Sequence, residues 1–447
     1  MTILEINKKL LLMKMHYFIG IGGYAPFSPF MATIAKQRGY SAVIVGLIFM
    51  VQPIPGLFIR PVIGVITDKF KCRRSAFISS TIIIFISIWL LSIIPGTTSK
   101  AEINDLDVVK SPLFWLFFAA IILMAMCDTI KNVMEETICT SLLGVNKYLY
   151  GKQRLWGSLG FGIFAIISGA CVDWYSKGQE YKNYTPAFTI SLVCFFCDII
   201  IVSNIEVIQN SSIKYVASDL TKILTKLKVR TFLLWAVLFG FLMAFITHFV
   251  FWYLEDLSTI FHPEKKSWMK TLQGMSVIMR CVSGEVLSFF LSSIILRYMD
   301  HKTVFSLSFF LFSVDFFLYS TIRNPVWALP IEVINGFTFG LSYSTAISYA
   351  AILAPTGSEG TLQGIVGTAI CGIGTPIGSI VGGYMFKHLG SLATFKILPI
   401  IALILCIAQM TINQLTIRGR KNANVHSQCT LSIETTKTNV DDNNTKF

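Results

Sequence analysis

Long apolar runs separated by short polar segments dominate the chain, and this pattern predicts helices that cross a membrane. A helix needs about 20 mostly apolar residues to span a bilayer. Such runs lie near 14–35, 41–66, 75–94, 112–144, 154–173 and 187–204, and then near 231–254, 268–295, 303–321, 326–353, 361–386 and 392–415. We therefore expect an all-α membrane protein with twelve transmembrane helices in two sets of six.

The polar gap in the middle of the chain sets the expected domain limits. It predicts an N-terminal segment at 1–13, a first bundle at 14–204, a linker at 205–230, a second bundle at 231–415 and a tail at 416–447. The linker stretch SDLTKILTKLKVR could form a basic amphipathic helix at an anionic leaflet. The tail is rich in Asn, Thr and Ser without an apolar period, which predicts disorder.

Lysine and arginine gather in alternate connections, and this predicts the orientation of the chain. Cytoplasmic loops carry an excess of these cations. The N-terminal segment, the linker and the tail are all on the cation-rich side, whereas TTSKAEINDLDVVK on the other side mixes in acids. Both termini are therefore expected in the cytoplasm, at the plasma membrane or an endomembrane. Asn183-Tyr184-Thr185 falls on the external side and is a possible N-glycosylation site in a short loop.

Composition excludes several other classes of protein. Only 14% of the residues are charged, below the roughly 25% of soluble proteins. The net charge of +13 comes from cations that flank apolar runs, so a nucleic-acid partner is not expected. The ten cysteines lie mostly in apolar runs or on the cytoplasmic side, where thiols stay reduced. Without a phosphate-binding loop, a histidine–acid cluster or a metal-ligand spacing, we expect no cofactor, no metal and no enzyme activity.

One short connection, GVITDKFKCRR, combines a glycine, an acid and several cations at fixed spacing. It fits the pattern G-x-x-x-D-[RK]-x-x-x-[RK]-[RK] through Gly64, Asp68, Lys69, Arg73 and Arg74. This resembles the loop 2–3 motif of the major facilitator superfamily, although the usual second glycine is replaced. The resemblance implies that the glycine allows close helix approach and that the acid braces the two halves when the cytoplasmic side is closed. The alternative is that the cations only follow the orientation rule.

Three longer stretches narrow the resemblance. They are YGKQRLWGSLGFGIFAIISG, LPIEVINGFTFGLSYSTAISYAA and GTLQGIVGTAICGIGTPIGSIVGGYMFKHLG. They resemble one eukaryotic branch of the superfamily, the group around major facilitator superfamily domain-containing protein 6, which is similar to bacterial oligosaccharide and nucleoside proton symporters. The match covers about 25–415 and implies a transporter fold, whereas substrates across the branch are diverse.

Two glycine-rich runs, the fifth and the eleventh, occupy equivalent places in the two halves, which indicates pseudo-symmetric bundles. Small residues at this spacing let helices touch backbone to backbone. Both a gating role and simple tight packing remain open for these positions, which are Gly157, Gly160, Gly374, Gly378 and Gly382.

Ionisable residues inside apolar runs are costly unless paired or hydrated. In the fourth run, Asp128, Lys131 and Glu135 are spaced three and four apart and share one helix face. We expect this face to line a central cavity and to handle protons or solute. The alternative is a structural ladder of ion pairs along the helix.

The second half carries a corresponding set. Glu332 and Asn335 share a face of the tenth run, where we expect a cavity position, with exposure at the rim as the alternative. Arg280 lies near mid-membrane, so we expect a carboxylate partner, either Glu285 or an acid on a facing helix.

Three further ionisable residues leave two interpretations open. His248 could titrate at mildly acidic pH or be a hydrogen-bonded packing residue. Asp198 and Asp315 could have hidden partners or lie on a pathway.

Together these features predict a secondary-active transporter that acts as a monomer in the lipid bilayer. It is expected to move a small solute by alternating access, as a proton-coupled symporter. Protonation of a buried acid would shift the equilibrium between the two openings. The acids considered for this role are Asp128, Glu135, Glu285 and Glu332. The alternative is a transporter-like receptor or scaffold that does not translocate. Acids lining a polar cavity would favour transport, whereas acids locked in pairs would favour the alternative.

Overall fold

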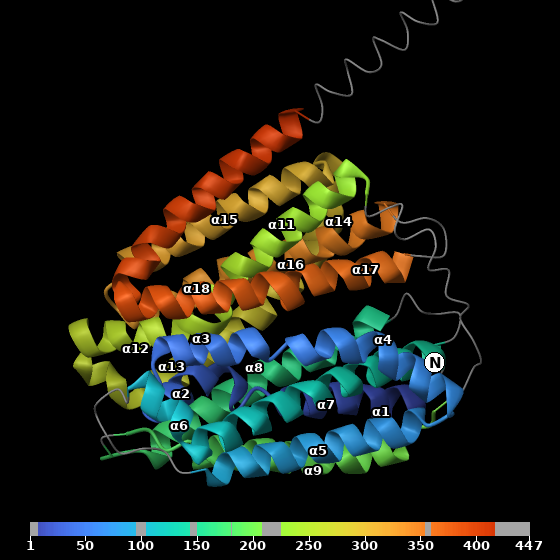
Figure 1. Cartoon of the computed structure of the whole chain (residues 1–447), viewed down its shortest axis with the longest axis horizontal. Helices are drawn as coiled ribbons and strands as arrows, with labels where there is room; N and C mark the ends of the chain where they lie inside the picture. The colour runs from blue at the N-terminus through green and yellow to red at the C-terminus, as the bar shows by residue number, and fades with distance from the viewer. Residues whose placement is uncertain are drawn as a thin grey trace, which may run out of the picture.

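The computed structural model describes residues 8–94, 104–143, 150–179, 181–207, 225–353 and 359–415. These residues form helices and connecting segments, with no strand among them (Figure 1). The predictions for the first residues, for the amphipathic part of the linker before residue 225 and for the tail after residue 415 lie outside the described residues.

The first half of the chain folds into helices that follow the first six apolar runs. They are α1 Lys8–His16, η1 Tyr17–Ile21, η2 Ser28–Phe30, α2 Met31–Gln37, α3 Ala42–Val51, α4 Ile54–Lys69, α5 Arg73–Ile93, α6 Asp105–Lys110, α7 Pro112–Leu143, α8 Tyr150–Tyr175 and α9 Thr185–Asn204.

The second half follows the remaining runs in the same way. Its elements are α11 Leu227–Ala244, η4 Phe245–Phe249, α12 Val250–Phe261, η5 Pro263–Trp268, α13 Met269–Ile278, η6 Met279–Glu285, α14 Val286–Tyr298, α15 His301–Thr321, η7 Pro325–Trp327, α16 Ala328–Leu353, α17 Glu359–Gly367, η8 Thr368–Gly374 and α18 Thr375–His388. A last helix spans Ser391–Leu415.

Nine helices in the described part are long and apolar enough to cross a membrane. Large apolar side chains such as Trp89, Phe196 and Ile404 are exposed on their outer faces, where lipid would cover them. The predicted runs near 14–35, 268–295 and 326–353 are not among the nine, so the count of twelve spans stays a prediction.

Several predicted spans are interrupted rather than continuous. A turn after η1 breaks the first run, and α3 gives way to α4 at Gln52-Pro53, both at the proline-containing stretches. Four π-helical segments, η1, η4, η6 and η8, interrupt the first, seventh, eighth and eleventh runs. Such segments are rare and frequently mark functional sites.

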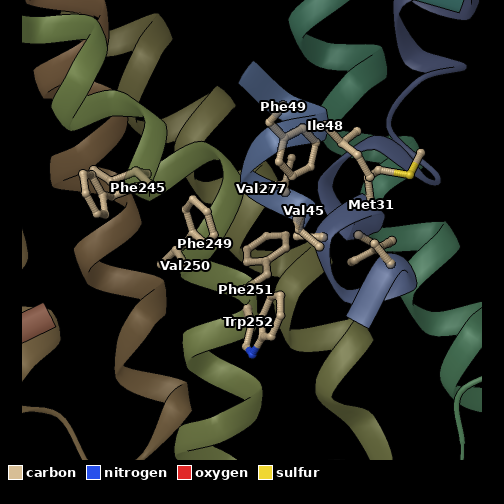
Figure 2. Close-up of a cluster of buried hydrophobic side chains, with 14 of the residues drawn as sticks. Met31, Val45, Ile48, Phe49, Phe245, Phe249, Val250, Phe251, Trp252 and Val277 are labelled. Atoms are coloured by element: carbon tan, nitrogen blue, oxygen red, sulfur yellow. The ribbon is translucent and has the colours of Figure 1, made fainter. Parts of the chain in front are cut away.

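The helices gather into two groups, one from each half of the chain (Figure 1). Across the boundary between them, α3 packs along α18 and α8 packs along α13. Apolar side chains of both halves meet there: Figure 2 shows residues of α2 and α3 turned toward residues of η4 and α12. This apolar cluster forms one wall of the site described next.

Candidate functional site

A cavity of about 310 Å³ lies between the two halves. The first half contributes residues from η1, η2, α2, α3, α7 and α8, and the second half contributes residues from η4, α12, α13 and η6. Its apolar wall includes Phe49 and Phe251 of the cluster in Figure 2. Its polar side chains are Ser28, Gln52, Arg154, Ser158, Thr247, His248 and Arg280. An apolar cavity with a few polar groups suits a small polar molecule.

His248 of η4 is both a cavity residue and a hydrogen-bonded packing residue. Its ring stacks on Phe49 across the boundary, with ring centroids 4.1 Å apart and planes 12° apart. Its Nδ1 lies 2.8 Å from Ser379 Oγ, and that hydroxyl already donates to the Thr375 carbonyl. His248 Nδ1 must therefore donate to the hydroxyl, which makes Nε2 the acceptor nitrogen.

Arg280 of η6 has its carboxylate partner on the facing helix α16. Its Nε and Nη2 donate to the two oxygens of Glu332 at 2.7 and 2.8 Å, a bidentate pair. Tyr319 and Asn335 donate to the same carboxylate at 2.9 and 3.3 Å. Glu332 is fully buried, so the alternative of exposure at the rim is wrong. Neither Glu332 nor Asn335 belongs to the cavity lining, so the expected cavity position is not observed in this conformation either. The side chain of Glu285 lies outside the described residues.

Asp315 of α15 is buried near this pair. Neither of its oxygens has a hydrogen-bond partner within the described part of the chain. The hydroxyl of Thr338 lies near Asp315 and donates to the Ile334 carbonyl at 2.9 Å. A buried acid without a partner is rare, and this one lies beside the cation that lines the cavity.

A second buried cluster lies inside the first half, behind the cavity wall. His16, the last residue of α1, has Nδ1 2.6 Å from Asp198 Oδ1 and Nε2 3.1 Å from Glu135 Oε2. Lys131 Nζ lies 3.7 Å from Asp198 Oδ2 and donates to the Gly20 carbonyl at 3.1 Å. His16, Glu135 and Asp198 are completely buried.

The prediction that the charged face of α7 lines the cavity is wrong in this conformation. Lys131 and Glu135 are buried against α1, η1 and α9, and neither they nor Asp128 belongs to the cavity lining. The ladder alternative is wrong as well, because no ion pair joins these three described side chains to one another. Asp128 instead accepts from Asn132 at 2.9 Å. Lys131 and Glu135 instead find their partners on other helices. Of the two interpretations of Asp198, the structure supports an acid with hidden partners, which are His16 and Lys131.

At one end of the molecule the two halves touch backbone to backbone. We call this the closed end; it carries α6, η5 and η7 and is the end predicted to be external. A Cβ added to Gly46 of α3 would lie 2.5 Å from the Ser379 carbonyl oxygen, and one at Gly383 of α18 would lie 2.4 Å from that of Ala42. Gly169 of α8 makes the same kind of contact with Lys270, at 2.1 Å. Side chains would hold these helices apart.

Polar ties also join the halves at the closed end. Lys36 Nζ lies 2.5 Å from Asp256 Oδ1, Lys270 donates to Thr33 at 2.9 Å, and Lys182 donates to the Ser267 carbonyl at 2.6 Å. The main-chain nitrogen of Thr271 donates to Asp173 at 2.6 Å, and Lys387 pairs with Asp105. Burial alone would raise the pKa of Asp105, but hydrogen bonds from Lys387 and Ser41 and the charge of Lys387 lower it below its usual value.

The gate motif lies at the opposite end, where the halves are apart. Among the described residues, no atom would lie within 4 Å of a Cβ placed at Gly64, or at Gly364 or Gly367 of α17. The close approach implied for Gly64 is therefore absent in this conformation. Arg74 donates to the Ser203 carbonyl within its own half at 2.6 Å. Lys69 is exposed, Arg73 is buried, and the side chain of Asp68 lies outside the described residues.

The predicted packing glycines lie against helices of their own half. In α8, a Cβ at Gly160 would lie 2.0 Å from the Phe18 carbonyl oxygen, and one at Gly157 would lie 2.5 Å from the Ile21 side chain. The ridge Gly374, Gly378 and Gly382 lies in the same way against α11 and η4. Backbone-to-backbone packing is thus observed at Gly160, Gly374 and Gly378, whereas Gly157 and Gly382 face side chains. The glycines that join the halves were not singled out from the sequence.

Asn183, the possible glycosylation site, is described at the start of α9. Its Oδ1 accepts from the main-chain nitrogen and the hydroxyl of Thr185 at 2.9 and 2.6 Å. Its modification stays a prediction.

Sequence reasoning missed His16 and Arg154 as site residues. His16 is an ionisable residue within the first apolar run, so the rule applied to the fourth run would have found it. Arg154 was not singled out, yet it lines the cavity and lies 3.6 Å from Glu136.

Comparison with known sequences identifies the family. Residues 10–397 match the family described as MFS_1 like family. The chain belongs to this family. It is 24% identical over 304 residues to major facilitator superfamily domain-containing protein 6-like protein A of Xenopus laevis, covering 64% of this chain and 46% of that protein. It is 24% identical over 253 residues to protein B of the same organism, covering 54% and 38%. This MFS_1 like family member thus matches less than half the length of either relative.

Solved structures show the same fold. A structure titled as a mutant of the nucleoside transporter NupG superposes with a TM-score of 0.74 at 13% identity, covering 90% of this chain and 99% of that chain. A second structure, whose title concerns substrate recognition in proton dependent oligopeptide transporters, superposes with a TM-score of 0.65 at 11% identity. It covers 92% of this chain and 99% of that chain. The resemblance to the major facilitator superfamily is confirmed. This MFS_1 like family member is an integral multi-pass membrane protein with a fold used by transporters, a non-enzyme class.

Proposed function

We propose that the protein is a secondary-active transporter that moves a small polar solute by alternating access. The observation that carries this proposal is the cavity between two halves that are joined at one end and apart at the other. Twelve spans in two six-helix bundles would form these halves, and the bundles would rock about the cavity. In the predicted orientation, this structure is the state open to the cytoplasm.

The opposite state needs the closed end to part and the gate end to meet. At the closed end the contacts are hydrogen bonds, ion pairs and glycine packing, all of which can separate. At the gate end, the uncovered glycines of α4 and α17 leave room for close helix approach. The gate motif next to Gly64 would then brace the halves, as its resemblance implies.

The cavity favours a solute with hydrogen-bonding groups and an apolar part. Arg154, Arg280 and Gln52 offer donors, and Nε2 of His248 offers an acceptor. Phe49, Phe161 and Phe251 offer apolar contact. Two structural neighbours are titled as a nucleoside transporter and as proton dependent oligopeptide transporters. Proton-coupled symport fits these titles and the ionisable clusters buried in each half.

Flux into proteoliposomes under an imposed pH gradient tests the proposal. A panel of nucleosides, short peptides and oligosaccharides should contain one solute whose uptake requires the protein and increases with an inward proton gradient. Arg154→Gln tests the cavity itself. It removes a cavity cation and leaves the buried clusters intact, so it should weaken solute uptake.

A second candidate function is a transporter-like receptor or scaffold. It is favoured by one observation: Glu135, Asp198 and Glu332 are paired and do not line the cavity. A solute of the panel that binds the purified protein without any flux would support this function and contradict transport.

A further inference from the structure

His16 makes contacts that a neutral imidazole between two ionised acids cannot make. Its two ring nitrogens lie 2.6 Å from Asp198 Oδ1 and 3.1 Å from Glu135 Oε2. A neutral imidazole has one N–H donor and one bare acceptor nitrogen. With both carboxylates ionised, the bare nitrogen would face an oxygen lone pair at hydrogen-bonding distance, and the contact would be repulsive.

The two contacts that join His16 to Asp198 and to Glu135 therefore need one hydrogen each. His16, Asp198 and Glu135, which we call the triad, must hold one proton beyond the state with a neutral imidazole and two carboxylates. That proton lies either on the ring, as an imidazolium that donates to both acids, or on one acid, which then donates to the ring. In either form both contacts are hydrogen bonds.

Charge balance gives the same result. Lys131 is the cation beside the triad, 3.7 Å from Asp198, and it is buried. With the additional proton, the triad and Lys131 together are neutral; without it they carry one net negative charge. An uncompensated charge is strongly unfavourable in the low-dielectric interior of a membrane protein.

The groups that face His16 come from each packed helix. Asp198 comes from α9, and Glu135 and Lys131 come from α7. Tyr17 follows in η1, with its ring centroid 5.8 Å away, and α5 contributes the uncharged ring of Phe77 at 5.0 Å. The two acids are thus the groups whose protonation depends directly on His16.

The triad is mechanically joined to the cavity through η1. A Cβ at Gly20 would lie 2.6 Å from Asp198 Oδ2, so the backbone of η1 lies directly on that carboxylate. Lys131 donates to the Gly20 carbonyl, and the next residue, Ile21, lines the cavity. Loss of the proton would push His16 away from a carboxylate and displace the helix that forms this wall.

We propose that His16, Asp198 and Glu135 form the proton-binding site of the protein, and that its occupancy sets the position of η1 at the cavity. As a coupling site it rests on the proposed transport function, whereas proton binding itself does not. The site differs from the acids expected from the sequence, because it contains a histidine and an acid from outside the fourth run and lies behind the cavity.

Proton release from the full-length protein in lipid nanodiscs tests the site without any solute. The pH is stepped from about 5 to about 8, where histidine commonly titrates, and a pH indicator reports the protons released. Glu135→Gln supplies an amide that can donate to the ring, so this variant needs no additional proton and should release about one proton fewer per molecule than the wild type.

Glu206→Gln is the matched control, because Glu206 is an exposed acid that pairs with Lys9 and lies outside the triad. It should release as many protons as the wild type. Asp198→Asn should behave like Glu135→Gln and serves if that variant does not fold. Equal release from the wild type and both triad variants would overturn the site.

Flux separates this inference from the proposed function. Proton-driven uptake that is unchanged in Glu135→Gln would overturn the coupling role while transport stands. A deficit in proton release in Glu135→Gln, together with a wild type that shows no flux for any solute, would support the site and contradict the proposed function.

Discussion

At the scale of single residues, buried charge decides what the sequence can and cannot predict. The need of Arg280 for a carboxylate follows from its depth in an apolar run, because an unpaired guanidinium there is costly. The identity of the partner does not follow, because Glu332 is 52 positions away on another helix. His16 and Asp198 are 182 positions apart, so their contact could not be predicted from the sequence either.

Removal of Arg280 should destabilise the protein strongly. Arg280→Gln leaves the buried carboxylate of Glu332 without its cation, which typically costs about 3–5 kcal/mol. Thermal unfolding in detergent should therefore show a large decrease in Tm. Arg280→Gln combined with Glu332→Gln should recover most of the loss, since no charge is left unpaired.

The matched control is Arg154→Gln, because Arg154 is about half exposed and its ion pair with Glu136 should contribute less than about 1 kcal/mol. If the single and double variants at Arg280 and Glu332 lose the same stability, the bidentate pair is not what holds η6 against α16.

At the scale of helices, the apolar runs predicted where helices form, because the apolar residues of a run belong to the helix that they predict. The breaks coincide with prolines, at the turn after η1 and between α3 and α4. The π-helical segments were not predicted, since they arise from packing between helices rather than from local pattern. For the same reason, the face of α7 with Lys131 was assigned to the cavity although it meets α1 and α9.

Glycines that look alike in the sequence should respond differently to one methyl group. Gly160→Ala places a Cβ against the Phe18 carbonyl oxygen and should cost about 1–3 kcal/mol through overpacking. Gly364→Ala meets no atom of the described residues within 4 Å in this conformation, and alanine favours the helix more than glycine does, so the unfolding midpoint should not fall.

Transport provides a second measurement on the same pair of variants. If the gate end closes during transport, Gly364→Ala should reduce solute flux at full stability, because the methyl group would stand between helices that must meet. Equal stability loss in both variants would contradict the packing described for α8 and η1.

At the scale of the whole molecule, two halves joined at one end and apart at the other dominate the structure. Family and fold were predictable because motifs and repeats survive in the sequence. The conformation was not, because it depends on contacts between residues far apart in the sequence, such as Lys36–Asp256 and Gly46–Ser379.

The tie between Lys387 and Asp105 should show a defined pH dependence. The lowered pKa of Asp105 means that the folded state prefers the carboxylate, so the tie stabilises the protein above the unfolded value of 3.8. That contribution is lost as the pH falls further, through the lowered value. Lys387→Gln should therefore cost less than about 1 kcal/mol at neutral pH and nothing in strong acid.

Chemical unfolding of the wild type and Lys387→Gln at both pH values measures this difference. Lys265→Gln is a suitable control, because Lys265 is a cation of the same end that donates to Asn324 rather than to an acid. A loss that persists unchanged in strong acid would mean that the carboxylate is not the partner that matters.

The backbone contact between α3 and α18 has an electrical consequence. A cavity that water enters from the gate end has the potential of that compartment, so the transmembrane voltage falls mainly across the short layer at Gly46 and Gly383. If the halves rock as proposed, this insulating layer would pass to the other side of the cavity. Any net charge held inside then crosses the field without itself moving, at about 2.3 kcal/mol per charge per 100 mV. The rate of the cycle should thus respond to voltage according to what the cavity carries.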